Sequence, residues 1–138
     1  MNTIDISTLL LRLSLASGFL SAVASRLGLW GKQSSGWHGF LDYTAQVNSF
    51  LPKSIIPAIA ITSTVLETLL GILLLIGFKT TYTAYGAALL TLLFAFAMTY
   101  SFGVKEPLDY SVFAFSAGAF LLATMPNYKL SIDQLLTK

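Results

Sequence analysis

Glu67 is the residue of this sequence with the clearest chemical role, because it lies near the middle of a long apolar stretch. An ionised carboxylate at that depth in hydrocarbon would lose its hydration at a large free-energy cost. We therefore expect Glu67 to face other helices, where it is either protonated or paired and hydrogen-bonded. Two roles remain open for it: a structural hydrogen bond between helices, or part of a substrate, quinone or proton site.

Two arginines of the first apolar stretch are candidate partners for Glu67. Judged by its depth in its helix, Arg12 is offset from Glu67 by about 7 Å, and Arg26 is offset by about 13 Å. Side chains lean toward the N-terminus of their own helix, which aims Arg26 inward and carries Arg12 outward. We expect Arg12 to reach Glu67, directly or through water or hydroxyl groups, with Arg26 as the secondary candidate. The alternative is that both arginines extend to their own headgroup regions.

His38 and Asp42 are further candidates, because they stand four residues apart in a segment with helical spacing. Such a pair can relay a proton, although a surface ion pair is the simpler role. A metal site is not expected, since one histidine, scattered carboxylates and no cysteine do not supply the ligands of zinc or haem. The lack of cysteine also excludes dithiol exchange within this chain.

The composition indicates that lipid is the main solvent of the chain. Of the 138 residues, 55% are hydrophobic and only 10% are charged, whereas a soluble domain carries about 25% charged residues. The mean hydropathy is +0.75. The net charge of +2 comes from scattered basic residues, which do not form the clustered face that nucleic-acid binding requires. The bilayer is therefore the expected partner, and nucleic acid is not.

Apolar segments long enough, or nearly long enough, to cross a membrane lie at about 7–29, 55–77, 82–102 and 108–125. Short connections make the later segments antiparallel neighbours. Between the first two segments, residues 37–51 have apolar side chains at helical spacing, which predicts a short amphipathic helix in the membrane interface. We predict an all-α fold, an integral membrane antiparallel four-helix bundle, with residues 1–138 in a single domain.

The sequence resembles the DoxX family of small four-helix membrane proteins over nearly its whole length. The positions that carry the resemblance are Leu9 to Leu13 around Arg12, Glu67 to Gly71, Gly77-Phe78, Phe40 to Pro52 and Lys105 to Ser111. Many relatives have a Gly-His-Gly-like stretch ending in Lys, where Ser21 to Arg26 here reads Ser-Ala-Val-Ala-Ser-Arg. The resemblance implies a bacterial cytoplasmic membrane and, for some relatives, a thiosulfate:quinone oxidoreductase or another redox system.

The buried acid and the resemblance together predict an accessory or membrane subunit of a quinone-linked redox system in the cytoplasmic membrane. Glu67 and Arg12 would line a polar spot inside the bundle, where a quinone head or a partner subunit binds. No resident cofactor is evident from the sequence, and quinone is the candidate ligand. The alternatives are a structural or interaction protein without catalysis, and a small binder or carrier of a hydrophobic solute.

Overall fold

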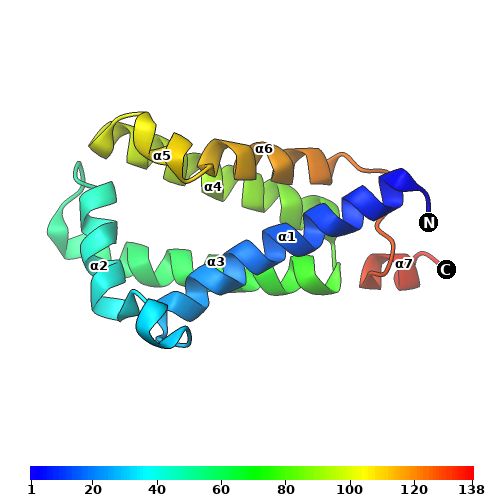
Figure 1. The fold of residues 1–138 in the computed structure, drawn as a ribbon, viewed down its shortest axis with the longest axis horizontal. Coiled ribbons are helices and arrows are strands. Elements are labelled where there is room, and N and C mark those ends of the chain that lie inside the picture. The colour runs from blue at the N-terminus through cyan, green and yellow to red at the C-terminus, as the bar shows by residue number, and fades with distance from the viewer.

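The computed structural model describes residues 1–138 and consists of helices joined by short connections (Figure 1). The longest helices are α1 (Thr3–Arg26), α3 (Ile56–Ile76) and α4 (Thr80–Phe102). The shorter helices are α2 (Gly36–Val47), α5 (Lys105–Asp109), α6 (Val112–Ala123) and α7 (Ile132–Leu136), with single turns η1 (Gly31–Gln33) and η2 (Lys53–Ile55). The prediction of an all-α fold is confirmed.

Three helices are long and apolar enough to cross a membrane, namely α1, α3 with its preceding turn, and α4. The fourth predicted segment, 108–125, is not one helix, because the chain breaks before α6 at Ser111, which adopts a φ of +57°. Helix α6 is apolar but has only 12 residues, or about 18 Å, whereas a crossing needs about 20 residues. The fold thus has three helices of spanning length where the sequence predicted four.

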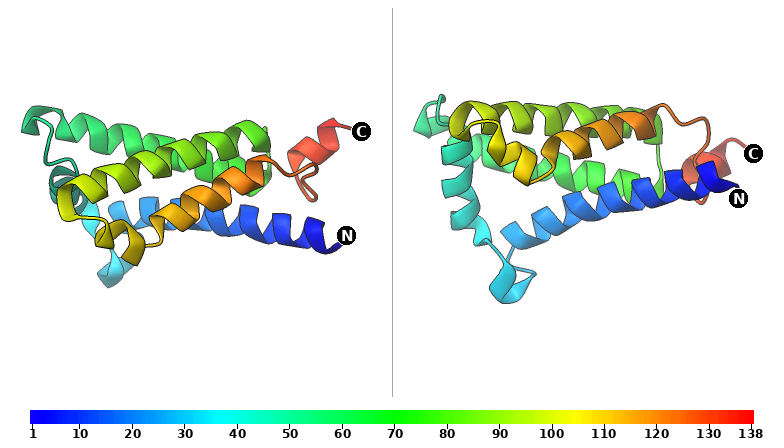
Figure 2. Two further views of the ribbon diagram at one scale, coloured as in Figure 1. Left: turned by 90° about the horizontal axis from the view of Figure 1, so that it is seen from above. Right: turned by 45° about the horizontal axis from the view of Figure 1, so that its top comes forward.

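The helices pack as two antiparallel pairs, with α1 on α3 and α6 on α4 (Figures 1 and 2). Gly71 permits the first contact, since a Cβ atom at this position would lie only 2.9 Å from Leu20 Cδ2. In the second pair, the Ser116 hydroxyl donates a hydrogen bond to the carbonyl of Ala88 at 2.7 Å. The core between the pairs is formed by Leu15, Ala16, Phe19, Leu74, Ala84, Ala87, Ala88, Ala119, Leu122 and Ala123.

Helix α2 lies across the end of the long helices that is remote from both chain termini (Figures 1 and 2). A helix was predicted here over 37–51, and the observed helix ends earlier, at Val47. Its end is tied to α4, because the Ser101 hydroxyl donates to the Val47 carbonyl at 2.5 Å. The rings of Tyr43 and Phe102 stack with their centroids 6.1 Å apart. These contacts hold α2 as an end wall over α3 and α4.

The opposite end of the molecule is closed by the C-terminal segment, which folds back onto the α3–α4 connection. The Asp133 carboxylate accepts hydrogen bonds from the backbone N–H groups of Lys79 at 2.7 Å and Thr80 at 2.8 Å. The backbone N–H of Asp133 in turn donates to the Gly77 carbonyl at 2.9 Å. Asp133 therefore satisfies donors at the start of α4 and fixes α7 beside the connection.

Candidate functional site

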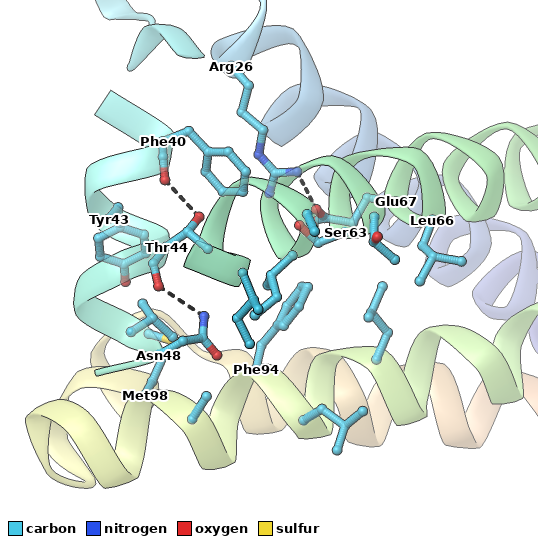
Figure 3. A pocket seen from close by; sticks show the side chains of 18 residues that line it. Arg26, Phe40, Tyr43, Thr44, Asn48, Ser63, Leu66, Glu67, Phe94 and Met98 are labelled. Carbon is cyan, nitrogen blue, oxygen red and sulfur yellow. Dashed lines mark hydrogen bonds and ion pairs between the residues drawn. The ribbon is translucent and has the colours of Figure 1, made fainter. Parts of the chain in front are cut away.

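A cavity of about 470 Å³ lies between α2, α3 and α4 (Figure 3). This volume falls in the range of small-molecule sites, about 300–1,000 Å³. Of its 18 lining residues 12 are hydrophobic, and these come mainly from α3 and α4. The remaining six lining residues are Arg26, Thr44, Asn48, Thr62, Ser63 and Glu67. The wall is thus apolar with a few polar groups, which is the usual composition of a ligand site.

The cavity occupies the half of the α3–α4 hairpin that lies next to α2. Near their connection the two helices are in close contact, and a Cβ atom at Gly86 would lie 3.4 Å from Leu70. Farther from the connection, Leu66 of α3 and Leu93 of α4 line the cavity and are 39% and 55% exposed. Because α2 closes the end, the cavity opens to the side, between α3 and α4.

Arg26 and Glu67 form a buried ion pair on the cavity wall (Figure 3). Arg26 Nη1 donates a hydrogen bond to Glu67 Oε2 and a second one to Thr64 Oγ1 at 3.0 Å. The two charged side chains are 9% and 6% exposed. The Phe40 ring lies over the guanidinium group, with 3.7 Å between the ring centroid and Arg26 Cζ, and this cation–π contact adds to its stabilisation. The pair is therefore neutral overall and held in one geometry.

The packing register of α1 on α3 explains why Arg26 is the partner. Leu20 contacts Gly71, and this contact fixes a common reference point on the two antiparallel helices. Arg26 lies six residues or about 9 Å beyond it along α1, and Glu67 lies four residues or about 6 Å in the same direction along α3. The lean of the arginine toward the start of its helix covers the remaining 3 Å or so. Arg12 lies about 12 Å in the other direction, so the predicted pairing of Arg12 with Glu67 is wrong.

Arg12 is placed at the terminal end of the molecule, away from the cavity. It is 2% exposed, and its Nη2 donates to the backbone carbonyl of Leu130 at 2.7 Å. Its Nε and Nη1 atoms have no hydrogen-bond partner in the chain, and the same holds for the buried hydroxyls of Thr8 and Thr80. Arg12 thus anchors the C-terminal segment. The sequence did not indicate this role, because it depends on where residues after 126 fold back.

His38 and Asp42 are both exposed on α2 and do not line the cavity. No ion pair or hydrogen bond joins them, so the structure does not bring together the proton-relay pair considered from the sequence. No group of three or more His, Cys, Asp or Glu side chains is placed to hold a metal ion. His38 and Asp42 therefore lie outside the cavity, on the exposed face of α2.

The opposite face of α2 supplies residues that the sequence reasoning missed as site residues. Phe40, Tyr43 and Thr44 line the cavity from this helix. Burial raises the pKa of the Tyr43 hydroxyl, and the negative charge of Glu106 raises it further, so this group stays protonated. The helical spacing of the apolar residues predicted a packed face here. It did not predict that this face would close a cavity.

Residues 4–109 of the chain match the family model of methylamine utilisation protein MauE. No curated protein and no solved structure matches the chain. The family match overturns the resemblance to the DoxX family. That resemblance depended on leucine-rich runs with an isolated Arg, Glu or Gly, which many helical membrane proteins need for packing and for buried polar contacts.

The matched region contains α1 to α4 and both members of the Arg26–Glu67 pair. The match covers most of the chain, and three of its helices are long and apolar enough to cross a membrane. The chain is therefore a membrane protein, and it belongs to the family of methylamine utilisation protein MauE.

Proposed function

We propose that this protein is an accessory membrane protein of a redox system for methylamine utilisation, and that it binds a quinone-type ligand in the cavity between α2, α3 and α4. The description of the family supports the metabolic setting. Oxidation of an amine releases electrons, and quinones are the electron carriers that dissolve in a bilayer. The cavity supports the ligand class.

We further propose that residues 1–138 form one domain in the cytoplasmic membrane, with α5 and α6 together making a fourth crossing antiparallel to α4. The apolar sequence of α6 and its packing along α4 support this arrangement. Both chain termini lie at one end of the molecule, as an even number of crossings requires (Figure 1). Helix α2 would lie in the interface at the other end.

The single observation that carries the ligand class is an apolar cavity with a neutral ion pair on its wall and an opening to the side. A neutral polar head would meet Arg26 and Glu67, and an apolar tail would leave between Leu66 and Leu93 into the lipid. Phe94, which also lines the cavity, offers an aromatic contact for a planar ring.

Methylammonium itself does not suit this cavity. A small cation would be attracted by the carboxylate of Glu67, but Arg26 already neutralises that charge. The face of Phe40, which could bind a cation, is already covered by the guanidinium group. The apolar wall would then only remove water from the cation at a free-energy cost. The protein would therefore act on the electron carrier and not on the amine.

A structural role is the second candidate, and one observation favours it. Arg26 already bonds both Glu67 and Thr64, so the pair could serve only to fix the register of α1 on α3. This role predicts that the cavity binds nothing. A carrier function has no comparable support in the structure.

The test is ligand binding by the full chain in lipid nanodiscs, measured by calorimetry with decylbenzoquinone and its quinol. Ala97→Phe adds a ring to the cavity wall. Leu89→Phe is the matched control, because Leu89 is on the same helix, is 60% exposed and does not line the cavity. We expect the wild type and Leu89→Phe to bind, and Ala97→Phe to bind at least about tenfold more weakly. Absence of binding, or equal binding by Ala97→Phe, would reject the quinone site.

The accessory role is tested in membranes of cells that lack the chain. We expect methylamine-dependent quinone reduction to be lost in these membranes and restored by the wild type or Leu89→Phe, but not by Ala97→Phe. Unimpaired reduction without the chain would exclude the redox role, whatever the binding result.

A further inference from the structure

We infer that the cavity selects the reduced form of the carrier, a quinol, because Arg26 and Glu67 together present one donor and one acceptor that a quinol hydroxyl satisfies at once. This inference rests on the proposed function, since it names the redox state of the ligand at the same site. It concerns binding and involves no electron transfer to the protein.

The donor is the part of the Arg26 guanidinium that the protein does not use. Both hydrogen bonds of this side chain, to Glu67 and to Thr64, come from Nη1. A guanidinium group has five N–H donors, so those on Nε and Nη2 are left for a ligand. Both nitrogens are accessible, because the fully buried atoms that lack a hydrogen-bond partner belong only to Thr8, Arg12 and Thr80, at the terminal end of the molecule.

The acceptor is the second carboxylate oxygen of Glu67. Oε2 receives the bond from Arg26, and Oε1 receives none within the chain. Oε1 is also accessible, since it is not among the fully buried atoms without a hydrogen-bond partner. Glu67 lines the cavity. An ionised carboxylate oxygen has only lone pairs to offer. It is therefore satisfied by a ligand that donates a hydrogen bond and not by one that only accepts.

Two hydroxyl groups of the cavity wall, those of Ser63 and Thr44, add acceptors to the site. Ser63 Oγ donates its hydrogen to the Ala60 carbonyl at 3.1 Å, and Thr44 Oγ1 donates to the Phe40 carbonyl at 2.7 Å. Because each hydroxyl has one hydrogen, both present only lone pairs to the cavity. These residues thus add acceptors beside Glu67 and no further donor.

The two redox states of the ligand differ in this one property. A quinone oxygen can accept from Arg26 but cannot donate to Glu67, and its binding would leave Oε1 desolvated and unpaired. A quinol hydroxyl accepts from Arg26 and donates to Glu67 through the same oxygen. Because a hydrogen bond to a charged group is worth roughly a factor of ten or more in affinity, we expect the quinol to bind at least about tenfold tighter.

The test compares three ligands on the full chain in nanodiscs under anaerobic conditions: decylbenzoquinone, its quinol, and the dimethyl ether of that quinol. The ether keeps the ring and both oxygens but cannot donate. We expect the quinol to bind at least about tenfold tighter than the quinone and the ether. Glu67→Gln should reduce this preference to about threefold or less, since a neutral amide can itself donate to a quinone oxygen.

Each outcome has a distinct meaning. If quinone or ether binds as tightly as the quinol, the selectivity is wrong but the proposed quinone site stands. If none of the three ligands binds the wild type, the proposed function and this inference both fail. If Glu67→Gln does not fold, the ether still decides the question on the unmodified protein, because it removes the donor from the ligand.

Discussion

Arg26 at the end of α1 donates a hydrogen bond to Glu67 in α3, and the two residues are separated by 41 positions in the sequence. Each charge lies in a place that it could not occupy alone, because desolvation of an unpaired ion costs several kcal/mol. The Phe40 ring covers the guanidinium group from the side of α2. One ion pair thus joins three helices and also forms the polar part of the cavity wall.

Breaking this pair on one side should be more harmful than removing both charges. We expect Arg26→Met or Glu67→Leu alone to lower the free energy of unfolding by about 3–5 kcal/mol, because each leaves an uncompensated buried charge. The double variant should be more stable than either single variant, which requires a coupling energy larger than one single loss, or more than about 3–5 kcal/mol. The measurement is denaturant unfolding in mild detergent.

The same cycle with Arg12→Met in place of Arg26→Met is the control. Arg12 lies at the other end of α1 and contacts Leu130 instead, so its effect should add to that of Glu67→Leu within about 0.5 kcal/mol. A strong coupling between Arg12 and Glu67, with none for Arg26, would contradict the observed register of α1 on α3.

Arg12→Met should release the C-terminal segment. The hydrogen bond from Arg12 to the Leu130 carbonyl comes from a charged donor, and its loss is worth about 1.5–3 kcal/mol. Trypsin cleavage after Lys129 should therefore become roughly 10- to 100-fold faster, because cleavage requires local opening. Mass spectrometry of the released fragment 130–138 measures the rate. Cleavage after Lys32 in exposed η1 should stay unchanged, and equal rates after Lys129 would rule out the anchoring role.

Gly77→Ala should be strongly destabilising for two separate reasons. Gly77 has a φ of +71°, and a Cβ atom there would lie 2.2 Å from Arg12 Nη1 and 2.3 Å from Ser131 Cβ. The backbone strain costs about 1–2 kcal/mol, and the overpacking adds about 1–3 kcal/mol. Gly28→Ala is the matched control, since Gly28 has a φ of +76° and nothing within 4 Å. Similar melting temperatures for the two variants would show that the contact with Arg12 is not tight.

Tyr128 should make the protein sensitive to alkaline pH. Burial raises the pKa of Tyr128 above its ordinary 10.0, the bond with Thr81 lowers it, and the charges of Asp133 and Tyr85 raise it again. A raised pKa means that the folded state holds the proton more tightly. Stability from this group is therefore complete below pH 10 and is lost as the pH rises from 10 through the folded-state pKa.

Tyr128→Phe should reverse this dependence at a cost at neutral pH. The variant loses the hydrogen bond from the Tyr128 hydroxyl to the Leu122 carbonyl, which is 2.9 Å long, and about 1 kcal/mol of stability at pH 7. Above pH 10 it should lose less stability than the wild type, because it has no phenol to ionise. Melting curves between pH 7 and pH 11 measure both effects, and parallel curves would exclude Tyr128 as the titrating group.

Much of the helical structure could be predicted, and the failures have a common cause. Long apolar runs indicated α1, α3 and α4 because a chain in lipid must satisfy its backbone groups internally. The break at Ser111 was missed because a φ of +57° at a serine has no reliable sequence signal. The cavity was missed because it exists only where α2 folds across α3 and α4.

By itself, the sequence determined that this is a helical membrane protein and that Glu67 must be buried among helices. Both conclusions follow from local properties, namely the composition and the free-energy cost of an unpaired carboxylate in hydrocarbon. Only the tertiary structure decided which arginine meets Glu67 and that a cavity lies beside the pair. The contact of Gly71 with Leu20 sets the register of α1 on α3. Arg12 and Arg26 are 14 residues apart, so a shift of about four helical turns would exchange the partners without changing one residue. Axial position between packed helices is a property of their contact and not of either helix.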